Sequence, residues 1–279
     1  MRRRILTLTQ YLLYRLLYSL TGLIYLVLAG AYYWIAFRTR TPEPDYFVLV
    51  IGFFGGLIAF FTTLSLAGRA NEAKSYPFFM RLESRIEYLT ALLLSAFIFS
   101  VTLQLLMSVV VLFRNGPEIT TTTLIDLPPI WFSINVLSIV VAMHASDFVS
   151  RGWSRVWVFG LLAVLLLLGD GSSGLSRWLT DQLRNLSLQD AGDSPLLQQF
   201  QENLLVWADF ISGEGGDVLG GLVSFVFWPI RAIINAELAG GSFTQAQAFA
   251  PAVLLLYATF LFLLASDYFA SKDLMLTED

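Results

Sequence analysis

The sequence contains no cysteine and a single histidine among its 279 residues. The absence of cysteine excludes disulfide bonds, thiolate metal sites and a cysteine nucleophile, and one histidine is too few for a histidine-based metal cluster. The sequence also contains no G-x-x-x-x-G-K-[ST] loop, whose backbone amides and lysine hold the phosphates of a nucleotide. The chain therefore lacks the residues of several common catalytic and nucleotide-binding sites.

Charged residues are also scarce. They make up 14% of the sequence, whereas hydrophobic residues make up 56% and the mean hydropathy is +0.68. A soluble domain of this length does not need so much apolar surface, so the composition predicts a polytopic membrane protein. Because lipid cannot pair with free backbone groups, we expect an all-α bundle of continuous helices that forms a single membrane domain over residues 1–279.

Apolar runs set the positions of the predicted spans. A helix rises 1.5 Å per residue, so about 20 residues cross the apolar core of a bilayer. The run at 156–169 has only 14 uncharged residues and would need Trp153, Arg155 and Trp157 at the interface. We predict six transmembrane helices, at residues 21–37, 46–68, 88–113, 127–147, 153–169 and 249–266.

Four of the segments outside these spans have a predicted role or location. Residues 1–20 are predicted to form an interfacial amphipathic helix rather than a cleaved signal peptide, because hydrophobicity continues to Phe37. The segment 170–248 is predicted to be extracytoplasmic and helical. Its uncharged run at 218–230 has 13 residues, which favours a re-entrant or packed helix over a crossing one. The other two segments, 69–87 and 267–279, are predicted to be cytoplasmic.

The distribution of basic residues predicts the orientation. With the N-terminus in the cytoplasm, the inside segments hold 11 of the 17 lysines and arginines, which agrees with the positive-inside rule. We therefore expect both termini to be cytoplasmic. The inside residues are Arg2, Arg3, Arg4, Arg15, Arg69, Lys74, Arg81, Arg85, Arg151, Arg155 and Lys272.

A short charged segment, residues 69–87, lies between two long uncharged runs, 46–68 and 88–113. We call it the bracket. Its charges are either a docking surface for a cytosolic protein, where charged pairs set register and specificity, or only the solvated face of a loop. The charged candidates are Arg69, Glu72, Lys74, Arg81, Glu83, Arg85 and Glu87.

Three stretches of sequence make the whole arrangement resemble a known family. The bracket continues into the third span as FFMRLESRIEYLTALLLSAF (78–97), SFVFWPIRAIINAELAGG (224–241) precedes the last span, and DYFASKDL (267–274) follows it. In this order of elements the chain resembles the permease subunit of a type 2 ABC exporter. Glu83 stands where that family usually has proline, and Ala91 where lysine is common.

The resemblance implies a function. The bracket would be a coupling helix seated on separate ABC ATPase subunits, which would bind the ATP and magnesium, so this chain itself would carry no cofactor and would not be an enzyme. A second permease copy or a paralogue would complete a dimer that exports a hydrophobic or amphipathic cargo, such as a lipid, peptide or drug-like molecule. The location implied is the plasma (inner) membrane of a prokaryote, with membrane lipids as partners and no nucleic acid.

Two other functions stay open. A degenerate permease would keep this fold as a non-transporting scaffold or assembly subunit. An intramembrane enzyme is disfavoured, because the runs carry no paired acidic motif or histidine cluster.

Two further sets of residues stand out within the predicted spans. Gly52, Gly55 and Gly56 include a small-x-x-x-small spacing that permits close helix packing, within the chain or across a dimer. Within the predicted span at 127–147, His144 and Asp147 are the only ionisable residues near the helix interior, which makes them a possible intramembrane polar site. An ion pair of Asp147 with Arg151 at the interface is the alternative.

Overall fold

The structure, a computed structural model, describes residues 2–38, 42–70, 84–146, 149, 160, 180–181, 205–206, 214–245 and 247–271. All regular secondary structure in these residues is α-helical, as predicted. The helices in chain order are α1 (Arg2–Leu17), α2 (Leu20–Phe37), α3 (Pro44–Ala70), α5 (Arg85–Asn115), α6 (Thr121–Ala145), α10 (Glu214–Leu238) and α11 (Ala250–Ser271).

The chain divides into two compact units. The first comprises Met1–Val158 and Pro229–Asp279, and the second comprises Phe159–Trp228. Along the sequence, the boundary between the units falls within α10, between Trp228 and Pro229. Apart from the first part of α10, the structure describes only Gly160, Thr180, Asp181, Leu205 and Val206 of the second unit.

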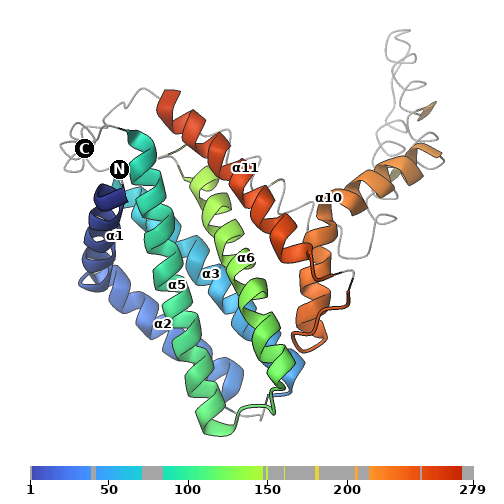
Figure 1. The fold of residues 1–279 in the computed structure, drawn as a ribbon, viewed down its shortest axis with the longest axis horizontal. Helices are drawn as coiled ribbons and strands as arrows, with labels where there is room; N and C mark the ends of the chain where they lie inside the picture. The colour runs from blue at the N-terminus through green and yellow to red at the C-terminus, as the bar shows by residue number, and fades with distance from the viewer. Residues whose placement is uncertain are drawn as a thin grey trace, which may run out of the picture. The chain divides into compact units, whose positions relative to one another are not determined.

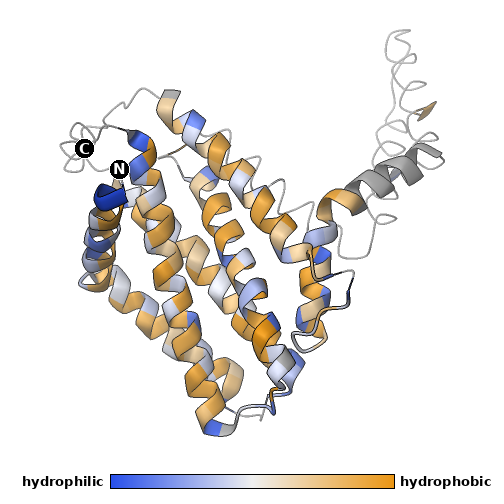
Figure 2. Cartoon of the chain, viewed as in Figure 1, coloured by the Kyte–Doolittle hydropathy of each residue, from blue (hydrophilic) through white to orange (hydrophobic). Residues whose placement is uncertain are grey.

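Five of the described helices are long and apolar enough to cross a membrane, which supports a multi-pass helical bundle. They correspond to five of the six predicted spans, and the colours in Figure 2 show that most of their residues are hydrophobic. The predicted span at 153–169 lies outside the described residues except for Gly160. The candidate spans are Leu20–Phe37, Pro44–Ala70, Arg85–Arg114, Thr123–Ala145 and Ala250–Ala270.

The observed helices extend beyond the predicted spans because capping residues, not charges, set their ends. Ser84 accepts a hydrogen bond from the Ile86 amide (3.3 Å) and starts α5 three residues before the predicted span. Thr120 accepts from the Thr123 amide (3.3 Å) and starts α6 six residues before the predicted span. The uncharged runs therefore locate these helices correctly but underestimate their length.

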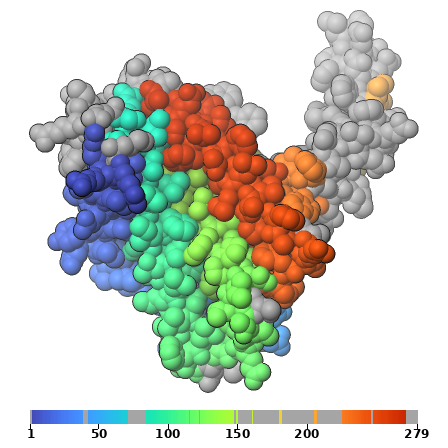
Figure 3. Space-filling model, in the orientation of Figure 1, coloured from blue at the N-terminus to red at the C-terminus, as the bar shows by residue number. Residues whose placement is uncertain are grey.

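Helix α3 lies at the centre of the first unit and α2 at its edge. Helix α3 packs against both α5 and α6, α11 packs on α6, and α1 packs on α5, as Figures 1 and 3 show for the elements in view. In its most apolar window 61% of α3 is buried, compared with 22% of α2. The exposed apolar side chains of α2 therefore form a surface suited to lipid or to another membrane helix.

A sharp corner separates α1 from α2. Ser19 caps α2 by accepting from the Gly22 amide (3.3 Å), and its hydroxyl donates to the carbonyl of Leu16 (2.7 Å) at the end of α1. Arg69, in the last turn of α3, donates from Nη2 to Ser19 Oγ (2.9 Å) and from Nη1 to the Arg15 carbonyl (3.4 Å). The arginine thereby links the end of α3 to both sides of the corner.

Two glycines end α10. Gly240 and Gly241 have φ angles of 71° and 85°, in the left-handed region that favours glycine. The Gly241 amide donates to the Ala236 carbonyl (2.8 Å), which closes the helix end in the manner of a Schellman motif. This turn directs the chain from α10 toward α11.

Candidate functional site

The structure places the outer residues of the bracket inside helices rather than in a loop. Arg69 belongs to the last turn of α3, and Arg85 and Glu87 belong to the first turn of α5. Glu87 also favours the start of α5, since a negative charge near a helix N-terminus interacts well with the helix dipole. The other four predicted contacts lie outside the described residues: Glu72, Lys74, Arg81 and Glu83.

The described residues of the bracket make contacts within the chain. Arg69 holds the corner between α1 and α2, and Arg85 donates from Nη1 to the carbonyl of Phe269 (3.4 Å) near the end of α11. Glu87 is only 2% exposed, so its carboxylate is not accessible to a docking protein in this structure. The sequence did not indicate that Arg69 would bond to the corner between α1 and α2, or that Glu87 would be buried.

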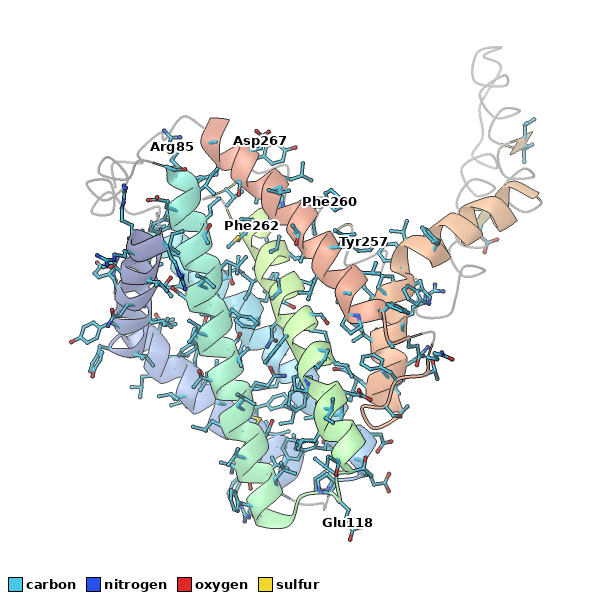
Figure 4. All side chains as sticks on the ribbon, in the orientation of Figure 1. Arg85, Glu118, Tyr257, Phe260, Phe262 and Asp267 are labelled. Atoms are coloured by element: carbon cyan, nitrogen blue, oxygen red, sulfur yellow. The ribbon has the colours of Figure 1, made fainter. Side chains whose placement is uncertain are left out.

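Arg85 and the end of α11 lie at the same end of the first unit. Figure 4 shows Arg85 and Asp267 there, with Glu118 of the connection between α5 and α6 at the opposite end. Arg85 of the predicted cytoplasmic segment 69–87 and Asp267 of the predicted segment 267–279 therefore lie at one end of the bundle. The prediction has four spans between these segments; α5, α6 and α11 correspond to three of them, and the fourth, 153–169, lies outside the described residues except for Gly160.

The glycines of α3 make room for polar side chains from other helices. A methyl group on Gly52 would overlap Oε1 of Glu237 and lie 3.3 Å from Trp131 Cδ1, and one on Gly55 would overlap the amide of Gln104. On Gly56 a methyl would lie 3.1 Å from Ile134. The glycine spacing is thus used for packing within the chain, but it admits side chains rather than a closely approaching backbone.

Two amide side chains join three helices beside Gly55. Gln104 of α5 donates from Nε2 to the carbonyl of Ile51 on α3 (3.0 Å), and Asn135 of α6 donates from Nδ2 to Gln104 Oε1 (2.8 Å). Gln104 is 1% exposed and Asn135 is fully buried. Because an unpaired polar group is costly in an apolar interior, this chain of bonds fixes how α3, α5 and α6 pack.

We predict that Gln104→Leu destabilises the protein by about 1–2 kcal/mol, because it leaves the Asn135 amide buried without its partner. Thermal unfolding in detergent measures the effect, with Thr102→Val, an exposed position on the same helix, as the control. The double variant Gln104→Leu/Asn135→Leu should lose less stability than the two single losses added together. Simple additivity would contradict the pairing.

One turn of helix from this pair lies a second polar group that the sequence did not reveal. Glu237 of α10 is 4% exposed, and its Oε1 accepts no hydrogen bond. Trp131 of α6, four residues before Asn135, is 5% exposed and its Nε1 has no acceptor. Both side chains lie against Gly52. Together, residues Gln104, Trp131, Asn135 and Glu237 form what we call the polar seam of α3.

Burial sets the ionisation of Glu237. Helix α10 is not among the five candidate spans, yet desolvation raises the pKa of the Glu237 carboxyl to about 8. No charged group contributes to this shift. At neutral pH the carboxyl is therefore mainly protonated and neutral, which lowers the cost of burying it.

The predicted polar site at His144 and Asp147 is described only in part. His144 Nε2 lies 2.8 Å from the carbonyl oxygen of Leu261, so it bridges α6 and α11. Asp147 lies outside the described residues. Outside that predicted span, Glu237 and Glu87 are almost fully buried, which the sequence did not indicate.

Part of the polar seam had a signal in the sequence. Gln104 and Asn135 are each the only amide side chain in their predicted spans, and polar residues there commonly bridge helices. Glu237 had no such signal, since it lies in the segment 170–248, which was predicted to be extracytoplasmic. Among the described residues, no three histidine, cysteine or acidic side chains gather as metal ligands.

Comparisons with known proteins add no assignment to this geometry. Neither the models of protein families, nor the curated proteins, nor the solved structures include a match to this chain.

Proposed function

We propose that the chain is a membrane-spanning permease subunit that separate ATPase subunits drive, as its resemblance to type 2 ABC exporters implies. The observation that carries the proposal is the bracket, a short charged segment between two long apolar helices, α3 and α5, that pack against each other. In this proposal, a force that the ATPase applies to the bracket moves α3 and α5, and α3 lies at the centre of the first unit.

The arrangement at the ends of the bracket supports this role. Arg69 links α3 to the corner between α1 and α2, and Arg85 links α5 to α11. A displacement of the bracket would therefore reach five helices at once. The chain has no phosphate-binding loop of its own, so in this proposal the partner supplies ATP hydrolysis.

The proposal includes a location and a cargo. The chain lies in the plasma (inner) membrane of a prokaryote with both termini cytoplasmic and works as a dimer with a second copy or a paralogue. Its many aromatic and aliphatic side chains suit a hydrophobic or amphipathic cargo. A non-transporting scaffold would bind the same ATPase without moving cargo, and vesicle transport assays distinguish the two.

We predict that Lys74→Glu/Arg81→Glu abolishes co-purification of ATPase activity with the chain. Both substitutions reverse a charge in the bracket without touching Arg69 or Arg85, whose contacts hold the fold. ATP hydrolysis in the eluate of the affinity-purified chain from native membranes is the measurement.

The matched control is Arg38→Glu/Arg114→Glu, which reverses two charges at the C-terminal ends of α2 and α5. This variant should leave the ATPase bound. Loss of ATPase in the control but not in the test variant would contradict docking at the bracket. An eluate of the unaltered chain without ATPase activity would overturn the proposed function.

A further inference from the structure

The carboxyl group of Glu237 is buried without a hydrogen-bond partner for Oε1. A carboxylate in such a position is very unfavourable unless a cation or several donors compensate its charge, whereas a protonated carboxyl is neutral. The ionised and protonated forms therefore differ greatly in how well they fit this position. Binding or release of a proton by this carboxyl therefore changes how stable its buried position is.

The last turns of α10, which carry Glu237, are part of the buried apolar core of the first unit. The side chains of Ala232, Ile233 and Ala236, on the same helix, belong to the buried core of the first unit. Gly52 lets the carboxyl lie directly against the backbone of α3, and the Trp131 indole closes the same spot from α6. The unpaired Trp131 N–H is the polar atom of the neighbouring side chain best placed to report a change at Glu237.

The ionisable groups of the helices around Glu237 do not compensate its charge. They are Asp45, Tyr46 and Arg69 on α3, Asp126 and His144 on α6, and Glu214, Asp217 and Arg231 on α10 itself, with Arg85, Glu87, Tyr88 and Arg114 near the ends of α5. Desolvation alone accounts for the raised pKa of Glu237. The response of this site to pH therefore arises from burial rather than from a neighbouring charge.

The end of α10 is held at two points. One is the Glu237 carboxyl at Gly52, and the other is Gly241, where a methyl group would lie 2.9 Å from a Leu127 methyl and 3.1 Å from the Thr123 methyl of α6. The second point is part of the left-handed turn that Gly240 and Gly241 form at the end of α10. Glycine has the conformational freedom that lets such a turn act as a pivot.

We propose that the Glu237 carboxyl is a proton-binding site that controls the docking of the last turns of α10 on α3. With the proton bound, the neutral carboxyl lies against Gly52 beside Trp131. Release of the proton to water leaves a carboxylate, which moves away from Gly52 to reach solvent and turns the end of α10 about the Gly240–Gly241 pair. This inference does not rest on the transport function, since it needs no ATPase or cargo.

Fluorine NMR of the full chain labelled with 5-fluorotryptophan tests the proposal. The chain has 7 tryptophans, and Trp131→Phe assigns the signal of Trp131. We expect this signal to shift with pH with a midpoint of about 8, and to stay constant in Glu237→Gln. The other tryptophan signals show that each variant is folded.

Two further variants sharpen the test. Asp126→Asn removes an acid from the helix of Trp131 and should leave the titration unchanged. Gly52→Ala places a methyl group where Oε1 lies, so it should expel the carboxyl and move the midpoint to lower pH. A Trp131 signal that does not titrate in the unaltered chain, or that still titrates in Glu237→Gln, would overturn the proposal.

Discussion

Replacing Gly22 with alanine is expected to open the corner between α1 and α2 and to destabilise the protein by about 1–3 kcal/mol or more. The new methyl group would overlap the Leu16 carbonyl oxygen and lie 3.2 Å from Leu17 Cα. These are backbone atoms, so they cannot rotate aside as the end of a side chain can. Thermal unfolding in detergent measures the loss, and limited proteolysis between α1 and α2 locates it.

Gly30→Ala on the same helix is the matched control. A methyl group there would meet no atom within 4 Å, and alanine favours a helix more than glycine does, so stability should be unchanged or slightly higher. If Gly22→Ala were as stable as Gly30→Ala, the close approach of the two helices at this corner would be refuted.

The stability of the protein is expected to fall as the pH rises from 4.5 to 8 because of Glu237. Burial raises the pKa of this carboxyl from 4.5 to about 8, so in this range the folded chain binds a proton that the unfolded chain has lost. The stabilisation is complete below the unfolded pKa and decreases by about 1.4 kcal/mol for each pH unit until the folded pKa is passed. Thermal unfolding across this range measures the slope.

Glu237→Gln should remove this part of the pH dependence, since the amide is close in shape to the protonated acid but does not ionise. The variant should therefore exceed the unaltered chain in stability above pH 8, the folded pKa, and match it most closely near pH 4.5, the unfolded value. Glu118→Gln, an exposed acid in the connection between α5 and α6, is the control and should follow the unaltered chain. Equal slopes in all three proteins would show that Glu237 ionises normally.

The helical bundle was predictable because lipid allows few alternatives. Uncharged runs located α2, α3, α5, α6 and α11, and their ends were missed by a few residues because Ser84 and Thr120 cap helices that continue past the first charge. Such caps are visible in the sequence. The prediction used charge to end a span, whereas the helix continues for as long as its backbone is paired.

The polar seam was less predictable because it depends on which helices meet. The glycines of α3 indicated close packing, but nothing in their spacing identified Gln104 or Glu237 as the side chains they receive. Glu237 is near an apolar run, and only the fold brings the end of α10 to α3. Gln104 and Asn135, each the only amide side chain in its predicted span, were the one signal in the sequence for this contact.

The lengths of α3 and α5 determine how far the bracket lies from the bilayer. Their 27 and 31 residues correspond to about 40 and 46 Å, compared with about 30 Å for the apolar thickness of a membrane. Helix α2, with 18 residues, is about 27 Å long and matches that thickness. A helix longer than the bilayer tilts or projects from it. A projection of α3 and α5 at the end that carries Arg69 and Arg85 would place these two arginines beyond the apolar core of the membrane.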